Sequence, residues 1–210
     1  AEKLKQQLSL NLLQQQVNPH FLYNTLDNIC ALAELDEKET LIQLVMNLSS
    51  FYRSSLSNGK MHISIGQELE ISRAYLEILQ IRYFHKFDFT ITCPEALKNY
   101  SCIKLLLQPI LENSIYHGIK GLDRHGILHI EAEDAGDCIR FTISDNGRGF
   151  SKEDYEKIWQ QDADHFGIKS IQQRILLYYG PGYGLSMESP QTGGCITVIT
   201  LPKQEGLPCH

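Results

Sequence analysis

A histidine directly follows a proline in the stretch NPHFLYNTL, which otherwise has the pattern of a helix. Neutral imidazole is nucleophilic near pH 7, because its reference pKa is about 6.5. On a helical wheel, His20 lies nearly opposite an apolar stripe. The residues of this stripe are Leu22, Leu26, Ile29 and Ala33. The placement predicts a histidine that faces solvent.

Two other roles for His20 remain as alternatives. A core histidine would sit on the apolar stripe. A metal ligand would have a second histidine or a carboxylate three or four residues away, and Tyr23 and Asn24 occupy those positions. The residues therefore argue against a core role and a metal role for His20.

A second stretch, SDNGRGF, could contact a bound base. An apolar strand pattern ends at Asp145, whose carboxylate can accept a hydrogen bond from a base edge. Gly147 and Gly149 allow the backbone to approach a ligand closely. A tight turn without a ligand is the alternative for this stretch alone.

Two helical stretches could hold phosphate or a cation. LLLQPILENSIYHGI carries Glu112, Asn113, Tyr116 and His117 away from its apolar face, and an amide oxygen such as that of Asn113 can ligate Mg²⁺. HFGIKSIQQRI places Gly167 at a helix start, where free N–H groups favour phosphate. A solvated helix face and a plain loop glycine are the respective alternatives.

The bulk composition limits the classes of function. The chain has 210 residues, of which 42% are hydrophobic and 21% charged, enough for one large or two small domains with a core. The net charge of −6 argues against direct nucleic-acid binding, and there is no polybasic membrane patch. The six cysteines form no C-x-x-C pair, which disfavours zinc and a disulfide framework.

The sequence is expected to be a piece of a longer protein. It begins at Ala1 without methionine and already in helical pattern. No signal peptide precedes it, and no apolar run approaches the roughly 18 residues of a membrane helix. Membrane spans could lie in a missing N-terminal part.

Residues 1–57 have the pattern of a helical hairpin. The second helix is expected to begin at Asp36, because Glu39 three residues later would complete a capping box. A lone hairpin has too little core, so we expect it to dimerise into a four-helix bundle. A flexible hinge is expected at residues 57–63.

The remainder has the pattern of an α/β sandwich, with helices on one face of a mostly antiparallel sheet. The strands are expected in FDFTITC, ILHIEAED, CIRFTISD and CITVITLP. One helix is expected from a cap at Ser64 to about His85, and another over 103–117 with a kink at Pro109. The polar segment 151–166 is expected to be a mobile loop over a site.

The order of these motifs resembles a known family. A helix with Glu-Asn, a strand ending in D-x-G-x-G, a polar loop and a glycine at a helix start resemble the N, G1 and G2 boxes of the GHKL ATP-binding fold. That superfamily includes histidine kinases, DNA gyrase-type ATPases, Hsp90 and MutL. The hairpin with QQQVNPHFLYNTL looks like the phosphoacceptor region of LytS-like and YesM-like bacterial sensor histidine kinases, whose hallmark is P-H-F-L-[YF]-N. The resemblance covers roughly residues 10–202.

The resemblance implies an α+β chain with two functional parts. Residues 1–60 would form the dimerisation and phosphoacceptor hairpin, and residues 61–210 the ATP-binding catalytic domain. The chain would autophosphorylate with ATP and Mg²⁺ and pass the phosphoryl group to an aspartate of a response regulator receiver domain. It would act as a homodimer, without nucleic acid, as the cytoplasmic portion of a bacterial inner-membrane sensor, reaching the membrane only through missing N-terminal segments. The alternatives are a GHKL ATPase and a catalytically degenerate dimerisation module.

The resemblance also implies roles for single residues. His20 would be phosphorylated on a ring nitrogen, and Glu112 would be a base or an orienting group. Asn113 would ligate Mg²⁺, and Asp145 would recognise the adenine amino group. The other nucleotide-binding residues implied are His117, Gly147, Gly149, Gly167, Ile168 and Lys169.

The chain departs from the family pattern at several positions. His165 replaces the first glycine of the third box, and Ser170 replaces an asparagine. Tyr116 stands where a lysine is often found in the N box, and Cys195 where a threonine is common. Lys169 is the candidate for the missing cation. The departures in the third box are the only support for a degenerate module.

Overall fold

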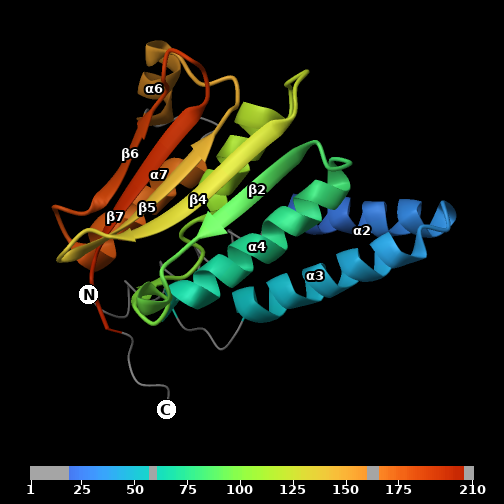
Figure 1. Cartoon of the computed structure of the whole chain (residues 1–210), viewed down its shortest axis with the longest axis horizontal. Helices are drawn as coiled ribbons and strands as arrows, with labels where there is room; N and C mark the ends of the chain where they lie inside the picture. The colour runs from blue at the N-terminus through green and yellow to red at the C-terminus, as the bar shows by residue number, and fades with distance from the viewer. Residues whose placement is uncertain (1–18, 57–60, 160–165, 206–210) are drawn as a thin grey trace.

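The computed structural model describes residues 19–56, 61–159 and 166–205, and it joins a helical hairpin to a domain with a five-stranded sheet (Figure 1). The hairpin consists of α2 (Pro19–Glu34) and α3 (Lys38–Leu56). This architecture confirms the predicted fold class. The elements that follow are β1 (His62–Ser64), α4 (Ile65–Arg82), β2 (Phe87–Thr92), η2 (Glu95–Leu97), β3 (Ser101–Ile103), α5 (Gln108–Asn113), η3 (Ser114–Ile119), β4 (Gly126–Asp134), β5 (Cys138–Asp145), α6 (Lys152–Trp159), α7 (Phe166–Tyr179), β6 (Gly184–Glu188) and β7 (Cys195–Pro202).

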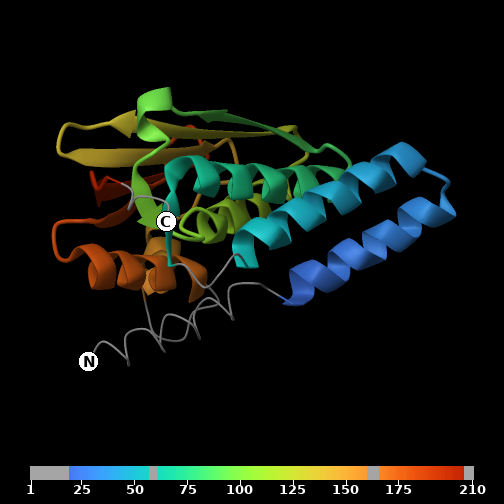
Figure 2. The same cartoon turned by 90° about the horizontal axis from the view of Figure 1, so that it is seen from below.

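The sheet has the strand order β2-β4-β5-β7-β6. Only the β2–β4 pair is parallel, and the other pairs are antiparallel, as the sequence predicts. The α-helices lie on one side of the sheet (Figure 2). Alternate residues of the strands are therefore buried, for example Leu128 and Ile130 of β4 and Phe141 of β5.

Helix α4 lies between the sheet and the hairpin. Its start is fixed by the predicted capping box, in which Ser64 Oγ accepts from Gln67 N and Gln67 Oε1 accepts from Ser64 N. Residues on several sides of the helix are buried, among them Ile65, Leu76 and Leu79. A helix that is apolar on several sides is buried between layers, which is why α4 can pack against both β2 and α3.

The face of α2 that packs on the rest of the chain differs from the predicted one. Phe21 and Thr25 are the buried residues of this helix. Leu26 of the predicted stripe is 44% exposed, and Ala33 is exposed. A helical wheel gives the angles between side chains, but it cannot say which face meets α4. Residues 1–18, where the first helix was also expected, and residues 57–60 of the expected hinge lie outside the described residues.

The prediction that Asp36 starts the second helix is wrong. Asp36 has a φ of 59° and ends α2 instead. Its N–H donates to Ala33 O, and the N–H of Glu37 donates to Leu32 O, which is the Schellman pattern of a helix C-terminus. Aspartate tolerates this left-handed backbone better than most residues, and the turn lets the hairpin reverse within a few residues.

The predicted kink at Pro109 is also wrong. The segment 103–117 is not one helix, because α5 begins only at Gln108, with Pro109 in its first turn. A proline is well tolerated there, since the N–H that it lacks would have no helical partner. The helix then continues into the π-helical turn η3, in which Lys120 N donates to Ile115 O.

The segment predicted as a mobile loop contains the helix α6. Ser151 caps this helix, because its Oγ accepts from Asp154 N while Asp154 Oδ2 accepts from Ser151 N. The low hydrophobicity of the segment favoured a loop, although the S-x-x-D signal was present. Residues 160–165 of the same segment lie outside the described residues.

A buried charged pair holds the turn before α5. Glu68 of α4 is fully buried, and its carboxylate accepts from Leu105 N (2.8 Å) and Leu107 N (2.9 Å). Arg174 of α7, 2% exposed, donates to the carbonyl groups of Leu105 and Lys104. Burial raises the pKa of the Glu68 carboxyl, while the two N–H groups and the charge of Arg174 act in the opposite direction. We call these contacts the Glu68–Arg174 clamp.

Replacing Glu68 with alanine is expected to destabilise the fold by about 3 to 5 kcal/mol, because the N–H groups of Leu105 and Leu107 would stay buried without an acceptor and the buried charge of Arg174 would lose its nearby opposite charge. Chemical denaturation measures the free energy of unfolding. The control is Glu133→Ala, which removes an exposed partner of Arg140 and should cost less than about 1 kcal/mol. Equal losses in the two variants would contradict the clamp.

Candidate functional site

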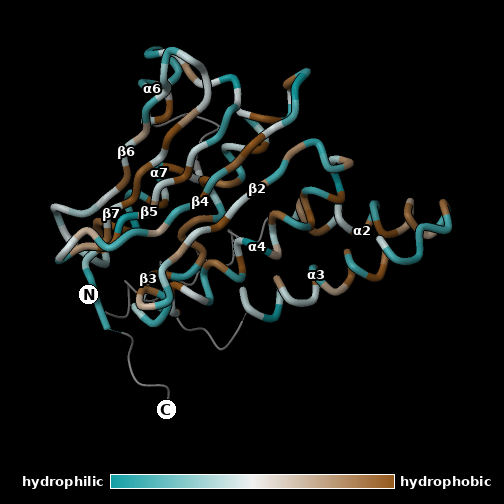
Figure 3. Tube along the Cα trace, in the orientation of Figure 1, coloured by the Kyte–Doolittle hydropathy of each residue, from teal (hydrophilic) through white to brown (hydrophobic). Residues whose placement is uncertain are grey.

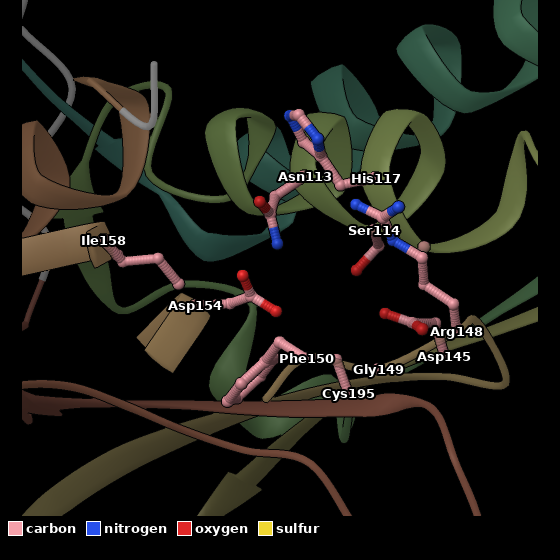
Figure 4. A pocket seen from close by; sticks show the side chains of 11 residues that line it. Asn113, Ser114, His117, Asp145, Arg148, Gly149, Phe150, Asp154, Ile158 and Cys195 are labelled. Carbon is pink, nitrogen blue, oxygen red and sulfur yellow. The ribbon is translucent and has the colours of Figure 1, made fainter. Parts of the chain in front are cut away.

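A pocket opens at the end of β5, between the helical segment α5–η3 and helix α6 (Figure 4). The side chains of Asn113 and Ser114 point into it from one side, and Asp154 and Ile158 of α6 reach it from another. The loop after β5 supplies a third wall. The residues that line the pocket are Asn113, Ser114, His117, Gly118, Asp145, Arg148, Gly149, Phe150, Asp154, Ile158 and Cys195.

Asp145 is the buried acid of this pocket, with 8% of its surface exposed. Its Oδ1 accepts from Gly147 N at 2.8 Å. Its Oδ2 is buried and has no hydrogen-bond partner among the described residues. Burial raises the pKa of the Asp145 carboxyl, and interactions with the Ser114 side chain and with the backbone of Gly147 and Cys195 act in the opposite direction. A buried acceptor without a partner is costly, so this atom is suited to a ligand that donates a hydrogen bond.

Two glycines bring the helix and the loop together at Asp145. A Cβ on Gly147 would lie 2.6 Å from both Asp145 Oδ1 and Gly118 Cα, and one on Gly118 would lie 3.1 Å from Asp145 Oδ1. The N–H of Arg148 donates to Gly118 O. Gly149 has a φ of +71°, where a side chain would be strained. The glycines therefore let η3 and the loop approach within backbone contact around the carboxylate.

The helical wall combines a short α-helix with a π-helical turn. Asn113 ends α5, and Ser114 begins η3. A π-helical turn shifts the following side chains relative to an α-helix and often occurs at functional sites. Asn113, Ser114, His117 and Gly118 consequently all reach the same pocket.

Glu112 points away from this pocket. Its Oε1 accepts from Tyr75 Oη of α4 at 3.1 Å and from Gln108 Nε2 at 3.3 Å. Burial raises the pKa of the Glu112 carboxyl, and both hydrogen bonds act in the opposite direction. The residue that the resemblance marks as a base or an orienting group thus lies against α4.

Helix α6 closes one side of the pocket with aromatic packing. The ring of Phe150 stacks on Tyr155 at 5.9 Å between centroids, and Tyr155 meets Trp159 edge-on. Ile158 is 4% exposed. The helix is therefore held against the loop after β5, with Asp154 directed into the opening (Figure 4).

His20 is exposed at the start of α2, as predicted. The amide nitrogen of Asn24 lies 3.0 Å from His20 Nδ1 and 3.2 Å from Nε2. An amide N–H donates only to a ring nitrogen that carries no proton, so the tautomer of His20 decides which of these two contacts is a hydrogen bond. His20 does not line the pocket.

The structure brings together only some of the predicted site residues. Asn113, His117, Asp145 and Gly149 line the pocket, and Gly147 supports Asp145 from behind. The residues Gly167, Ile168 and Lys169 do not line it.

At the start of α7, the two residues that precede Lys169 pack against other parts of the protein. Ile168 is 2% exposed and belongs to the core, and Gly167 lies so near Pro109 that a Cβ would be 3.1 Å from the Pro109 Cβ. His165 lies outside the described residues.

Sequence reasoning missed several lining residues. The π-helical turn that recruits Ser114 and Gly118 leaves no local signal in the sequence. Asp154 and Ile158 could have been found, because S-x-x-D followed by an apolar residue is a helix signal. The residues missed are Ser114, Gly118, Arg148, Phe150, Asp154 and Ile158.

The described residues contain neither a cluster of metal-ligating side chains nor a helix suited to cross a membrane. In residues 19–56, 61–159 and 166–205, no group of three or more His, Cys, Asp or Glu side chains could hold a metal ion. In the same ranges, no helix has both the length and the apolar character of a membrane span.

The sequence itself assigns the chain to a family. It belongs to the histidine kinase-, DNA gyrase B- and HSP90-like ATPases, whose family model matches residues 100–205. The histidine kinase family model matches residues 8–87, which include His20. These matches confirm the resemblance predicted from the boxes and the P-H-F-L-Y-N string.

The chain is similar to several bacterial sensor histidine kinases. It is 34% identical to sensor histidine kinase YesM of Bacillus subtilis over 92% of this chain and 33% of that protein. The identity is 28% with sensor protein LytS of Staphylococcus haemolyticus, over 93% and 34% of the two chains. It is 33% with sensor histidine kinase BtsS of Escherichia coli, over 86% and 31%. The chain thus spans about a third of these relatives.

Solved histidine kinase structures share the fold. The catalytic domain of histidine kinase ThkA superposes with a TM-score of 0.53 at 16% identity, over 68% of this chain and 95% of that one. The histidine kinase domain of a blue-light activated kinase from Erythrobacter litoralis gives 0.50 at 15% identity, over 81% and 83%. At these identities the likeness concerns the fold alone.

Replacing Gly147 with alanine is expected to destabilise the protein by about 1 to 3 kcal/mol, because the added Cβ would collide with Asp145 and the backbone of Gly118. Thermal or chemical unfolding measures the loss. Gly121→Ala is the control, since nothing lies within 4 Å of its Cβ position. A Gly147→Ala protein as stable as the control would contradict the close approach of loop and helix.

Proposed function

We propose that the chain is the phosphoacceptor and ATP-binding region of a sensor histidine kinase of a two-component system. It transfers the γ-phosphoryl group of ATP to its own His20 and then to an aspartate of a response regulator. The observation that carries this proposal is the buried Oδ2 of Asp145, which has no hydrogen-bond partner among the described residues, in a pocket of the same chain that exposes His20 beside Asn24. The matches to the histidine kinase and ATPase family models also support the proposal.

The pocket residues suit a nucleotide in one orientation. Asp145 Oδ2 lies in the pocket and can accept a hydrogen bond from the adenine amino group, while Gly147 and Gly118 let the loop and the helix close around the carboxylate. Asn113 would hold Mg²⁺ through its amide oxygen on the phosphate side. Magnesium supplies charge neutralisation of the phosphates when bound. His117 and Arg148 line the same opening and are positioned to contact the phosphates.

His20 is the proposed nucleophile. A neutral imidazole has a lone pair available for attack on phosphorus, and Asn24 contacts the His20 ring and can orient it. Phosphoryl transfer depends mainly on positioning and charge neutralisation, so the protein must bring the hairpin and the pocket into register. We propose residues 1–60 as the dimerisation and phosphoacceptor part and residues 61–210 as the ATP-binding part.

The proposed partners are a response regulator and a second copy of the chain. Histidine kinase ThkA, which shares the fold with a TM-score of 0.52, was crystallised in complex with response regulator protein TrrA. By analogy, a receiver domain would dock on the hairpin near His20. We also propose that the longer protein is a sensor of the bacterial cell membrane, with this region on the cytoplasmic side.

Exposed apolar residues on the hairpin support the dimer. Hydrophobic residues recur along α2 and α3 (Figure 3), and some of them are left uncovered. Those with more than two fifths of their surface exposed include Leu26, Ile42, Val45 and Met46. Residues 42, 45 and 46 share one face of α3, so a second hairpin could bury them in a four-helix bundle.

Incubation with Mg-ATP labelled at the γ-phosphate tests the kinase reaction. The wild-type protein is expected to become labelled with the acid-labile, alkali-stable chemistry of phosphohistidine. His20→Gln should remove the label and still bind ATP, because the pocket is intact. Asp145→Asn should weaken ATP binding by about tenfold or more, since an amide offers the adenine amino group a poorer acceptor than a carboxylate.

The outcomes separate the alternatives. Equal labelling of the His20→Gln variant would overturn the proposed phosphoacceptor. Repeated ATP turnover without a phosphoenzyme would indicate an ATPase. No ATP binding, with Asp145→Asn making no difference, would indicate a degenerate module.

Replacing Val45 with aspartate should weaken the proposed dimer by about tenfold or more, because a charge would enter an apolar interface. Analytical ultracentrifugation over a range of concentrations measures the association. The matched control is Ile127→Asp, because Val45 and Ile127 are both 42% exposed and Ile127 lies on strand β4. Unchanged association in the Val45 variant, or an equal loss in the control, would contradict a dimer through the hairpin.

A further inference from the structure

Three buried aromatic rings join the hairpin to the nucleotide-binding domain. Phe21 of α2, Phe51 of α3 and Tyr75 of α4 are 0 to 2% exposed. The ring centroids lie 5.0 Å apart for Phe21 and Tyr75, 5.4 Å for Phe21 and Phe51, and 5.8 Å for Phe51 and Tyr75. Phe21 directly follows His20 in the sequence. The position of the phosphoacceptor helix is therefore set by packing against Tyr75.

The other end of Tyr75 contacts the helix of the pocket. Its hydroxyl donates to Glu112 Oε1 at 3.1 Å, and Glu112 immediately precedes Asn113. A buried phenol needs a partner for its hydroxyl, and Glu112 is the partner that the fold provides. One side chain thus touches the residue after His20 with its ring and the residue before Asn113 with its hydroxyl.

Neither Tyr75 nor Glu112 lines the pocket. Their effect on a bound nucleotide must therefore be indirect, through the placement of the two helices. Close-packed interiors do not absorb small displacements. The packing of Phe21 on Tyr75 and the hydrogen bond from Tyr75 to Glu112 therefore fix the position of the hairpin relative to α5. Reactions that depend on positioning are sensitive to shifts of about 1 Å.

We propose that Tyr75 is a positioning residue whose hydrogen bond to Glu112 holds the hairpin in register with the Asn113 helix for transfer to His20. This inference rests on the proposed kinase function and assigns Glu112 an orienting role. The inference separates two measurable quantities. The hydrogen bond between Tyr75 and Glu112 supports the rate of phosphoryl transfer at saturating ATP, and the affinity for ATP does not depend on this bond.

Tyr75→Phe tests the inference, because it removes the hydroxyl and keeps the ring in the aromatic cluster. The rate of His20 labelling at saturating ATP is expected to fall by about tenfold, while the dissociation constant for ATP changes by less than about twofold. The matched control is Tyr52→Phe on α3, which removes a buried hydroxyl that has no partner among the described residues. The control should label at the wild-type rate. Circular dichroism and thermal unfolding verify that each variant is folded.

A double-variant cycle shows whether Tyr75 acts through Glu112. Glu112→Met removes the acceptor and keeps a long side chain. In that background, Tyr75→Phe should change the labelling rate by less than about twofold, since the bond is already lost. A loss of the same size in both backgrounds would overturn the inference.

Three other results would also count against it. An effect of Tyr75→Phe on ATP affinity alone, or a variant as active as wild type, would overturn the positioning role and leave the kinase function standing. A wild-type protein that binds ATP without labelling His20 would overturn the proposed function, and this inference with it.

Discussion

The Glu68–Arg174 clamp holds the turn on which the helical wall α5–η3 of the pocket depends. Two charged groups are taken out of water, and this is tolerable only where each is paired and hydrogen-bonded. Glu68 comes from α4, Arg174 from α7, and their shared target is the backbone of residues 104–107. The three segments must therefore assemble together. Since α5 starts directly after this turn, the clamp also fixes the helix that carries Asn113 to the pocket.

Helix α4 connects this clamp to the hairpin. Along one helix, Glu68 binds the turn before α5, Tyr75 binds Glu112 at its end, and the ring of Tyr75 packs on Phe21. The histidine-bearing helix and the pocket are thus positioned by the same element. Phosphoryl transfer depends on alignment, so it matters that α4 positions both parts. A displacement of the hairpin along α4 would change the distance from His20 to the pocket without altering the pocket itself.

The sequence allowed those features to be predicted that depend on local patterns. Strand β5 and the carboxylate at its end, Asp145, follow from strict alternation, because one face of the sheet is buried and the other is not. Asn113 followed from the order of the boxes. The position of Glu112 could not be predicted, since its partner Tyr75 lies 37 residues away. Asp36 was assigned to the wrong helix, because its role depends on a positive φ that the sequence does not record.

Tyr116, which stands where the N box often has a lysine, is a second case in which the local sequence does not reveal the contacts that a residue makes. From the motif alone, a tyrosine at position 116 predicts that a positive charge has been lost and that Lys169 replaces it. In the structure, Lys169 does not line the pocket. In the structure, Arg82 of α4 donates to the Tyr116 hydroxyl at 3.0 Å, and Lys120 Nζ lies 5.7 Å from its ring centre. Aromatic faces attract cations, so Tyr116 itself gathers positive charge from two other positions. Whether a motif has lost a charge is therefore decided by its neighbours in space, and these come from segments that the motif does not contain.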